Sequence, residues 1–574
     1  MEERKTKKID FSSKRLGLLA DKYYNAGDYV SALRLAYRQY KEYGGDGDVF
    51  TRLADIYEGM GLHGTANTWW YKFLDIASEE DLPDIYEGLA INYLNMGQEA
   101  PSAYYYNRLI DVDGEMSNEA KMEIINAFSK DKRAGFRFVY PPEFADYSKE
   151  IDFGSRALKM GDCKRAIDVL SRVVKGSKEY VEAKEMQAVA YLLDGNTEQA
   201  REVCESILQT NPNDVRTKAT LAAVYLEEGK DEQSRAIALE LYAQEQKDTD
   251  ELYKVATVCC ENGLHEYAYE KFCLLEEKLP YEGRMLYFKG VSAYKCGKVE
   301  EAEKAFSMLC TIYPDAEVTK YYLKALRMQG NADSDADADA PSLNEINYFY
   351  HLPQAEREAR CRYLVHMGRC AKDEAELLGL FAMHDNYFGW CFDEMDGNDH
   401  DLQYLGIVAA EHVGADGFIR EMLLDADVID VLKIETLRLL YMRNEPMEIG
   451  LVLCHIYRKL HLLPIKIGRK RRKKFLEAYA KVASKFVVVS DSHGKRICVA
   501  TEKLYRLLES KENLETVDNT DDLACAIFLH SGLKELGTDI NKIADAFDAN
   551  AEKVKELLSL AENKNEGVND NESH

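Results

Sequence analysis

The stretch YLLDGNTEQAREVCESILQTNPND, from Tyr191 to Asp214, decides the fold because its pattern recurs along the chain. A glycine returns every 34 residues, at Gly161, Gly195, Gly229, Gly263 and Gly297. A small residue follows five positions after each glycine: Ala166, Ala200, Ser234, Ala268 and Ala302. Glycine permits the left-handed backbone that ends a helix, and the small residue lets a second helix pack closely. Three of the units end in a proline that stops this second helix: Pro212, Pro280 and Pro314. The register therefore predicts repeated helical hairpins.

The same frame recurs upstream, where Gly27 and Gly61 are 34 residues apart and Gly97 follows 36 later. These residues resemble the tetratricopeptide repeat (TPR) family, whose units are antiparallel helix pairs stacked into a right-handed superhelix. The resemblance covers residues 13–330, with about eight units. It implies an all-α solenoid, and the apolar spacing beyond it predicts a mainly helical C-terminal region.

The domain boundaries follow from breaks in this pattern and from shifts in composition. Small residues and alternating aspartates, as in NADSDADADAPS, cannot bury apolar surface and predict a flexible linker. The expected segments are a polar N-terminus (1–12), repeats 1–3 (13–114), a degenerate repeat or linker (115–147), repeats 4–8 with a capping helix (148–330), an acidic linker (331–342), a helical-repeat-like domain (343–463), a helical C-terminal domain (464–561) and a disordered acidic tail (562–574).

Composition narrows the class of protein. The net charge of −27 disfavours binding of nucleic acid over the whole surface. The N-terminus lacks a secretory signal, and no apolar run is long enough to span a bilayer. The 13 cysteines include no CxxC pair, and most fall at apolar helix positions, which is typical of a reducing compartment. We expect a cytoplasmic protein with no metal and no cofactor. The sequence assigns no oligomeric state.

The C-terminal half shows helical periodicity without the repeat motif. Its apolar spacing is weakly similar to HEAT-like alpha-hairpin repeats. Cys454, His455 and His461 are expected on a helix, where they do not converge as zinc ligands. One extended piece is expected at 486–489. The stretch 522–558 predicts a helix pair that either is purely structural or reads DNA as a helix-turn-helix, and its acidic residues favour the structural interpretation.

A basic run, KIGRKRRKK, begins this C-terminal domain. Such a run can bind phosphates, anionic lipid or acidic protein surfaces, or can simply be a solvated start of a helix. Its cations are Lys466, Arg469, Lys470, Arg471, Arg472, Lys473 and Lys474.

The TPR resemblance also indicates where a partner would bind, because the first helix of each hairpin lines the concave face in that family. The candidates are Val189, Leu192, Leu226, Tyr253, Tyr287, Val291 and Tyr294. Such apolar and aromatic residues suit an extended peptide or a partner helix, although each could instead pack between hairpins. Family members that grip a terminal carboxylate use lysines and asparagines, and the corresponding positions here include Ile151, Ser155 and Glu185. That clamp is therefore not expected.

The sequence thus predicts a non-catalytic scaffold or adaptor that binds a protein or peptide in its repeat groove. It contains no phosphate loop and no nucleophile elbow, so no enzyme is expected. The alternative is a regulator that engages nucleic acid through the basic run and the final helix pair. A double variant, Tyr253→Ala with Tyr287→Ala, is expected to weaken partner capture while leaving helical content intact.

Overall fold

The computed structural model describes residues 12–114, 116–128, 146–159, 161–330, 346–369, 388–393 and 399–562. The chain forms two compact units. Unit 1 combines Met1–Ile124 with Gln354–His574, and unit 2 is Ile125–Pro353. The predicted acidic linker (331–342) lies outside the described residues, as do residues 1–11 and 563–574 of the two predicted terminal segments.

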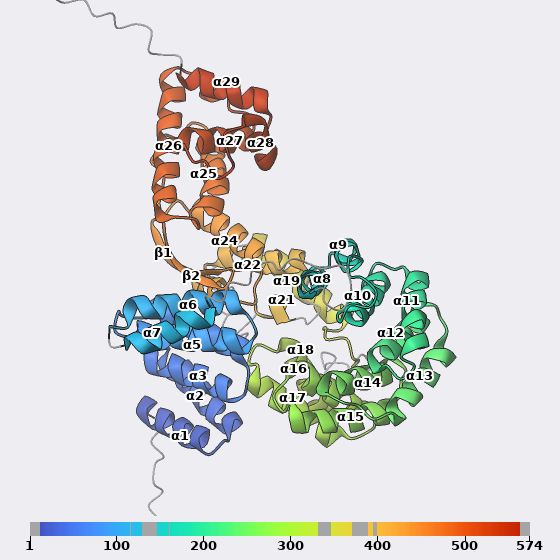
Figure 1. Ribbon diagram of the computed structural model, residues 1–574. Coiled ribbons are helices and arrows are strands. Elements are labelled where there is room, and N and C mark those ends of the chain that lie inside the picture. Colours follow the sequence, from blue (N-terminus) through green and yellow to red (C-terminus); the bar gives the residue numbers. More distant parts are fainter. Residues whose placement is uncertain are drawn as a thin grey trace, which may run out of the picture. The chain divides into compact units, whose positions relative to one another are not determined.

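Helical hairpins follow one another through the described residues between 12 and 330 (Figure 1). Unit 1 opens with α1 (Ser13–Asn25), α2 (Tyr29–Tyr43), α3 (Gly47–Gly59), α4 (His63–Ile76), α5 (Leu82–Asn95) and α6 (Glu99–Val112), and α7 (Asn118–Phe128) crosses the boundary between the units. Unit 2 continues with α8 (Ser148–Lys159), α9 (Cys163–Leu170), α10 (Tyr180–Leu193), α11 (Thr197–Thr210), α12 (Val215–Glu227), α13 (Asp231–Ala243), α14 (Thr249–Glu261), α15 (His265–Lys278), α16 (Gly283–Lys295), α17 (Val299–Ile312) and α18 (Glu317–Gly330).

The hairpin turns have the geometry that their residues predict. Gly195 and Gly263 adopt φ of +77° and +66°, which is the left-handed region that side chains with a Cβ avoid. The turn after α10 closes when the backbone N–H of Asn196 donates to the carbonyl of Tyr191 at 2.8 Å. Ala200 and Ala268 are fully buried where the two helices of a hairpin approach each other. The repeated glycine and the small residue therefore act together to reverse the chain and close the helix pair.

The first helices of neighbouring hairpins in unit 2 contact one another, α10 with α12 and α12 with α14. They form a continuous inner layer, while the second helices α11, α13, α15 and α17 each pack against the first helix of their own hairpin. In Figure 1 these pairs appear in green tones. This layering places equivalent positions of successive first helices along one surface.

The C-terminal part of unit 1 is also mostly helical. Its helices are α19 (Gln354–Arg369), α21 (Trp390–Asp393), α22 (His400–Val413), α23 (Asp416–Leu424), α24 (Asp430–Met442), α25 (Arg472–Phe486), α26 (Asp491–Ser510), α27 (Thr520–Ser531), α28 (Ile540–Phe547) and α29 (Ala551–Glu562), with a short 3₁₀ turn, η2 (Leu514–Thr516). Outside turns and connecting segments, the described residues contain one further element, a two-stranded sheet. The predicted all-α class is confirmed.

The expected helix around Cys454 is wrong. β1 (Met447–Leu453) and β2 (Ile456–Leu462) form an antiparallel hairpin in which Leu453 pairs with Ile456. Cys454 and His455 make the two-residue turn, with φ of 49° and 63°. Two successive positive φ values match the tight turn that suits the twist of the flanking strands. His461 lies on β2, so the side chains once assigned to one helix are split between turn and strand.

The extended piece expected at 486–489 is also wrong, because α25 runs through Phe486 and a turn follows. The final helices behave as a structural pair. Ile543, Phe547 and Val554 are buried, and the Phe547 ring lies 5.6 Å from the Phe528 ring. The apolar face of α28 and α29 therefore belongs to the core of the C-terminal helices, with α27 packed against both.

Candidate functional site

The predicted groove residues all lie on first helices of unit 2, on α10, α12, α14 and α16. Five of them have half-buried side chains: Val189, Leu192, Leu226, Tyr253 and Tyr294. Tyr287 and Val291, in contrast, are fully buried. The predicted groove residues thus divide into five half-buried side chains on α10, α12, α14 and α16 and two fully buried ones on α16.

The cover at Tyr287 is a segment of the same unit. Residues 346–353, which we call the strap, lie against the start of α15 and against α16 and α18 without forming a helix or strand. The Tyr287 hydroxyl donates to the carbonyl of Asn347 at 3.0 Å. The Tyr322 hydroxyl on α18 donates to the carbonyl of His351 at 3.1 Å. Two tyrosines of the inner layer thus bond to backbone carbonyls of the strap.

Two tyrosines of the strap point into the same surface. The Tyr350 ring packs edge-on against the Tyr287 ring at 4.7 Å, and its hydroxyl accepts from Thr319 at 3.1 Å. The Tyr348 hydroxyl lies 2.9 Å from Nδ1 of His265, and its ring is 6.1 Å from that of Phe288. Edge-to-face ring pairs add stabilisation beyond the apolar area that they bury.

Side chains of the strap alternate between inward and outward directions. Ile346 and Tyr350 are 3% and 4% exposed, whereas Phe349 between them is 66% exposed. The backbone bends at Phe349 and at His351, and the N–H of His351 donates to the carbonyl of Phe349 at 3.0 Å, so the strap is a turned segment. The sequence pattern placed this segment in the following domain (343–463). A signal was present in INYFYHLP, where three consecutive aromatics stand shortly before a proline that restricts its neighbour to extended backbone.

The earlier part of the groove carries charge among its apolar residues. Arg216 on α12 pairs with Asp250 at 2.8 Å and lies 3.4 Å from Asp248. Burial, reinforced by Asp214, raises the pKa of Glu185 to about 7. The positive charges of Arg216 and Lys254 oppose this rise in the pKa, and Glu182 adds to it.

This raised pKa predicts a pH-dependent stability. Between about pH 4.5 and 7 the folded chain holds a proton on Glu185 that the unfolded chain releases, so stability falls as pH rises through this window. Glu185→Gln should therefore stabilise the chain at pH 8 by about 1 kcal/mol, after allowance for solvent screening, and have little effect at pH 4. Thermal unfolding at the two pH values measures this. Glu202→Gln, at an exposed position on α11, is the matched control, and an equal gain at both pH values for Glu185→Gln would contradict the assignment.

Some cations of the basic run form ion pairs and hydrogen bonds within unit 1. Arg471 and Lys470 pair with Glu515 at 2.8 and 3.1 Å. Lys474 donates to the carbonyl of Asp518 at 2.6 Å. These cations hold the start of α25 against the segment that joins α26 to α27, including η2.

The rest of the run lies at the surface. Exposed side chains are Lys466, Arg469, Arg472 and Lys473. Lys473 is 3.8 Å from Glu477 on the same helix, a separation at which an exposed pair contributes little. Binding of nucleic acid by this run stays a prediction.

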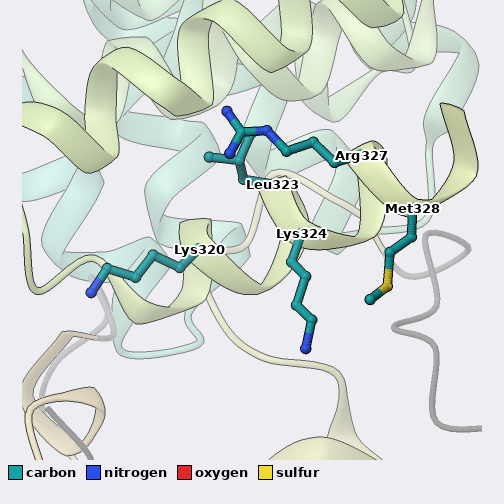
Figure 2. Close-up of a pocket in the computed structure, with 5 residues that line it drawn as sticks. All are labelled: Lys320, Leu323, Lys324, Arg327 and Met328. Atoms are coloured by element: carbon teal, nitrogen blue, oxygen red, sulfur yellow. The ribbon is translucent and has the colours of Figure 1, made fainter. Parts of the chain in front are cut away.

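Two hollows in the described residues show charge but no converging ligand set. In unit 1 a hollow of about 660 Å³ is lined by several aspartates of α1, α3 and α5, with Arg52 paired to Asp21 at 2.6 Å. On α18 a smaller hollow is lined by Lys320, Leu323, Lys324, Arg327 and Met328. Figure 2 shows that its cationic side chains extend in different directions. Arg327 already pairs with Glu303 at 2.8 Å. Neither hollow is therefore a better candidate binding site than the surface that carries the predicted groove residues.

Among the described residues there is no cluster of three or more His, Cys, Asp or Glu side chains arranged to hold a metal ion. Within the same ranges, no helix combines the length and apolar character needed to cross a bilayer.

Two family models of the tetratricopeptide repeat match the chain, over residues 151–215 and 191–257. The chain therefore contains tetratricopeptide repeats. The matched residues span the hairpins from α8 to α14, which include the half-open part of the groove. TPR arrays typically act as non-catalytic modules that hold protein or peptide partners, so the fold supports a protein-interaction scaffold. None of the curated proteins matches this chain.

Solved TPR structures are similar at low identity. YrrB, described as a TPR protein with an unusual peptide-binding site, is 15% identical over 31% of this chain and 91% of its own, with a TM-score of 0.24. A TPR protein from Parabacteroides merdae is 14% identical over 49% of this chain and 99% of its own, with a TM-score of 0.24. The human IFIT1 dimer with m7Gppp-AAAA is 14% identical over 76% of this chain and 91% of its own, with a TM-score of 0.28. The two family models and the geometry of the hairpins identify the repeats.

Proposed function

We propose that this TPR protein is an adaptor that binds an extended peptide segment of a protein partner along the inner layer of unit 2. The half-open surface on α10, α12 and α14 is the proposed binding surface, with Val189, Leu192, Leu226 and Tyr253 as its apolar contacts. Apolar side chains on successive helices, spaced by the repeat, suit an extended chain better than a compact ligand.

The observation that carries this proposal is the strap. A non-helical segment already lies against α16 and α18, with its carbonyls accepting hydrogen bonds from Tyr287 and Tyr322. Because these bonds reach the backbone, they are independent of the side chains of the bound segment. First helices of this unit therefore have donors that can hold a peptide backbone, and further along the repeats α14 packs against α12 and α12 against α10.

Selection from a display library of random 12-residue peptides against the full chain tests the proposal. The selected peptides should bind Leu226→Ser at least about tenfold more weakly than the unaltered chain, because the variant removes an apolar contact of about 1.5–3 kcal/mol. Tyr253→Ala should act in the same direction. Fluorescence anisotropy gives the affinities, and circular dichroism checks that helical content is kept.

Leu239→Ala provides the matched control, because Leu239 lies on the second helix α13 and is 41% exposed. This control should bind the selected peptides as the unaltered chain does. If Leu226→Ser and Tyr253→Ala also leave binding unchanged while folding normally, the inner layer is not the binding surface.

A further inference from the structure

The strap resembles a bound ligand more than a structural connection. The side chains that contact it are Tyr287 on α16, Thr319 and Tyr322 on α18, and His265 at the start of α15, with ring contacts from α16. Phe349 is mostly exposed, so one side of the strap is turned outward.

The two inward tyrosines, Tyr348 and Tyr350, are two positions apart in the sequence and occupy separate contact sites on unit 2. Tyr350 lies between Tyr287 of α16 and Thr319 of α18. Tyr348 lies between Phe288 of α16 and His265 at the start of α15, beyond the end of α14. Each place pairs an aromatic ring with a polar partner for the tyrosine hydroxyl. This pairing selects tyrosine over an aliphatic side chain, since a buried hydroxyl partner left unmatched costs binding free energy.

We propose that the strap is an internal ligand of the groove, and that the protein partner of this section presents a Tyr-x-Tyr sequence in the turned conformation of the strap and competes with it. This inference builds on the proposed function and names the chemistry of the partner peptide. Occupancy by the strap is intramolecular, so its effective concentration is on the order of millimolar. A partner peptide must therefore displace the strap, and its apparent affinity is lowered until the strap is released.

The test replaces residues 346–352 of the full chain with a Gly/Ser segment of equal length and adds the missing peptide in trans. The probe is a fluorescein-labelled peptide of residues 346–353, INYFYHLP. We expect this probe to bind the strap-replaced chain at least about tenfold more tightly than the unaltered chain, whose groove is already filled. A rise in the thermal unfolding temperature of the strap-replaced chain on adding the unlabelled peptide is a second readout.

Altered peptides supply matched controls. Changing both Tyr348 and Tyr350 to alanine should weaken binding at least about tenfold, because the two ring contacts and their hydroxyl bonds are lost. Changing Phe349 to alanine should leave binding within about twofold, because this side chain is turned outward. Equal weakening by the two changes would overturn the proposed Tyr-x-Tyr selectivity.

The outcomes separate this inference from the proposed function. If INYFYHLP does not bind a strap-replaced chain of normal helical content, or binds it no better than the unaltered chain, the internal-ligand inference is wrong. The library peptides and the Leu226→Ser variant still test the proposed function independently. They measure peptide binding to the surface on α10, α12 and α14 rather than to the section beneath the strap.

Discussion

Tyr287→Ala is expected to lower the free energy of unfolding of the repeats of unit 2 by about 3–5 kcal/mol, the range for removing a buried aromatic side chain. Tyr287 is fully buried, its ring stacks on Phe306 at 5.6 Å, and the strap residue Tyr350 packs edge-on against it. The substitution opens a cavity beside Phe306 and removes the partner of the strap. Chemical denaturation followed by circular dichroism measures the loss.

Tyr287→Phe is the matched control, because it keeps the ring and removes only the hydroxyl that donates to Asn347. It should cost about 1 kcal/mol, the usual net value of one hydrogen bond. Since repeats interact mainly with their neighbours, the loss in Tyr287→Ala should appear first as unfolding of α16 to α18. A loss below about 1 kcal/mol for Tyr287→Ala would contradict the packing described for this ring.

This expectation corrects the double variant suggested by the sequence. Tyr253→Ala remains a fair probe of the groove, because Tyr253 is half-buried on its inner side. Tyr287→Ala is not, because the ring is part of the core and its loss would change folding together with binding. Single substitutions at Leu226 or Tyr253 therefore replace the double variant as tests of partner capture.

Lys433→Ala is expected to destabilise unit 1 by about 3–5 kcal/mol, the range for breaking a buried charged contact. Lys433 on α24 is 1% exposed, and its ammonium donates to the carbonyl of Val452 at 2.7 Å and to that of Asp425. Burial lowers the pKa of this ammonium, against the opposing effect of Asp425, Asp430 and Asp427. Removing it leaves carbonyl oxygens and carboxylates without their cation.

Lys433→Met separates charge from volume, because it keeps most of the stem and loses only the ammonium. It should cost less than Lys433→Ala yet still more than about 1 kcal/mol, since the Val452 carbonyl stays unpaired. Unfolding monitored by denaturant titration gives both values. If Lys433→Ala left the midpoint unchanged, the ammonium would not be holding β1 against α24.

The same region shows why part of unit 1 could not be predicted. The hydroxyls of Tyr71 on α4 and Tyr105 on α6 donate to the carbonyl of His455 at 2.8 and 3.1 Å. Tyr457 next to this turn donates to Asp75 at 2.9 Å. These residues are separated by hundreds of positions in the chain, and helical spacing within a short window carries no signal for such pairs. The β-hairpin was locally visible only as alternation in IYRKLHL, which competed with an apparent helical period.

The sequence by itself determined the repeat, because the features that make it are local. Gly195 must adopt positive φ, Ala200 must fit between two helices, and a turn of fixed length must join them, so a 34-residue period is enough to predict hairpins. It also placed the groove candidates on first helices. Only the tertiary structure decided which of them face an open surface, since Tyr253 and Tyr287 occupy the same repeat position and differ because the strap covers one of them. That difference depends on a contact between segments about 60 residues apart, which local pattern and propensity do not encode.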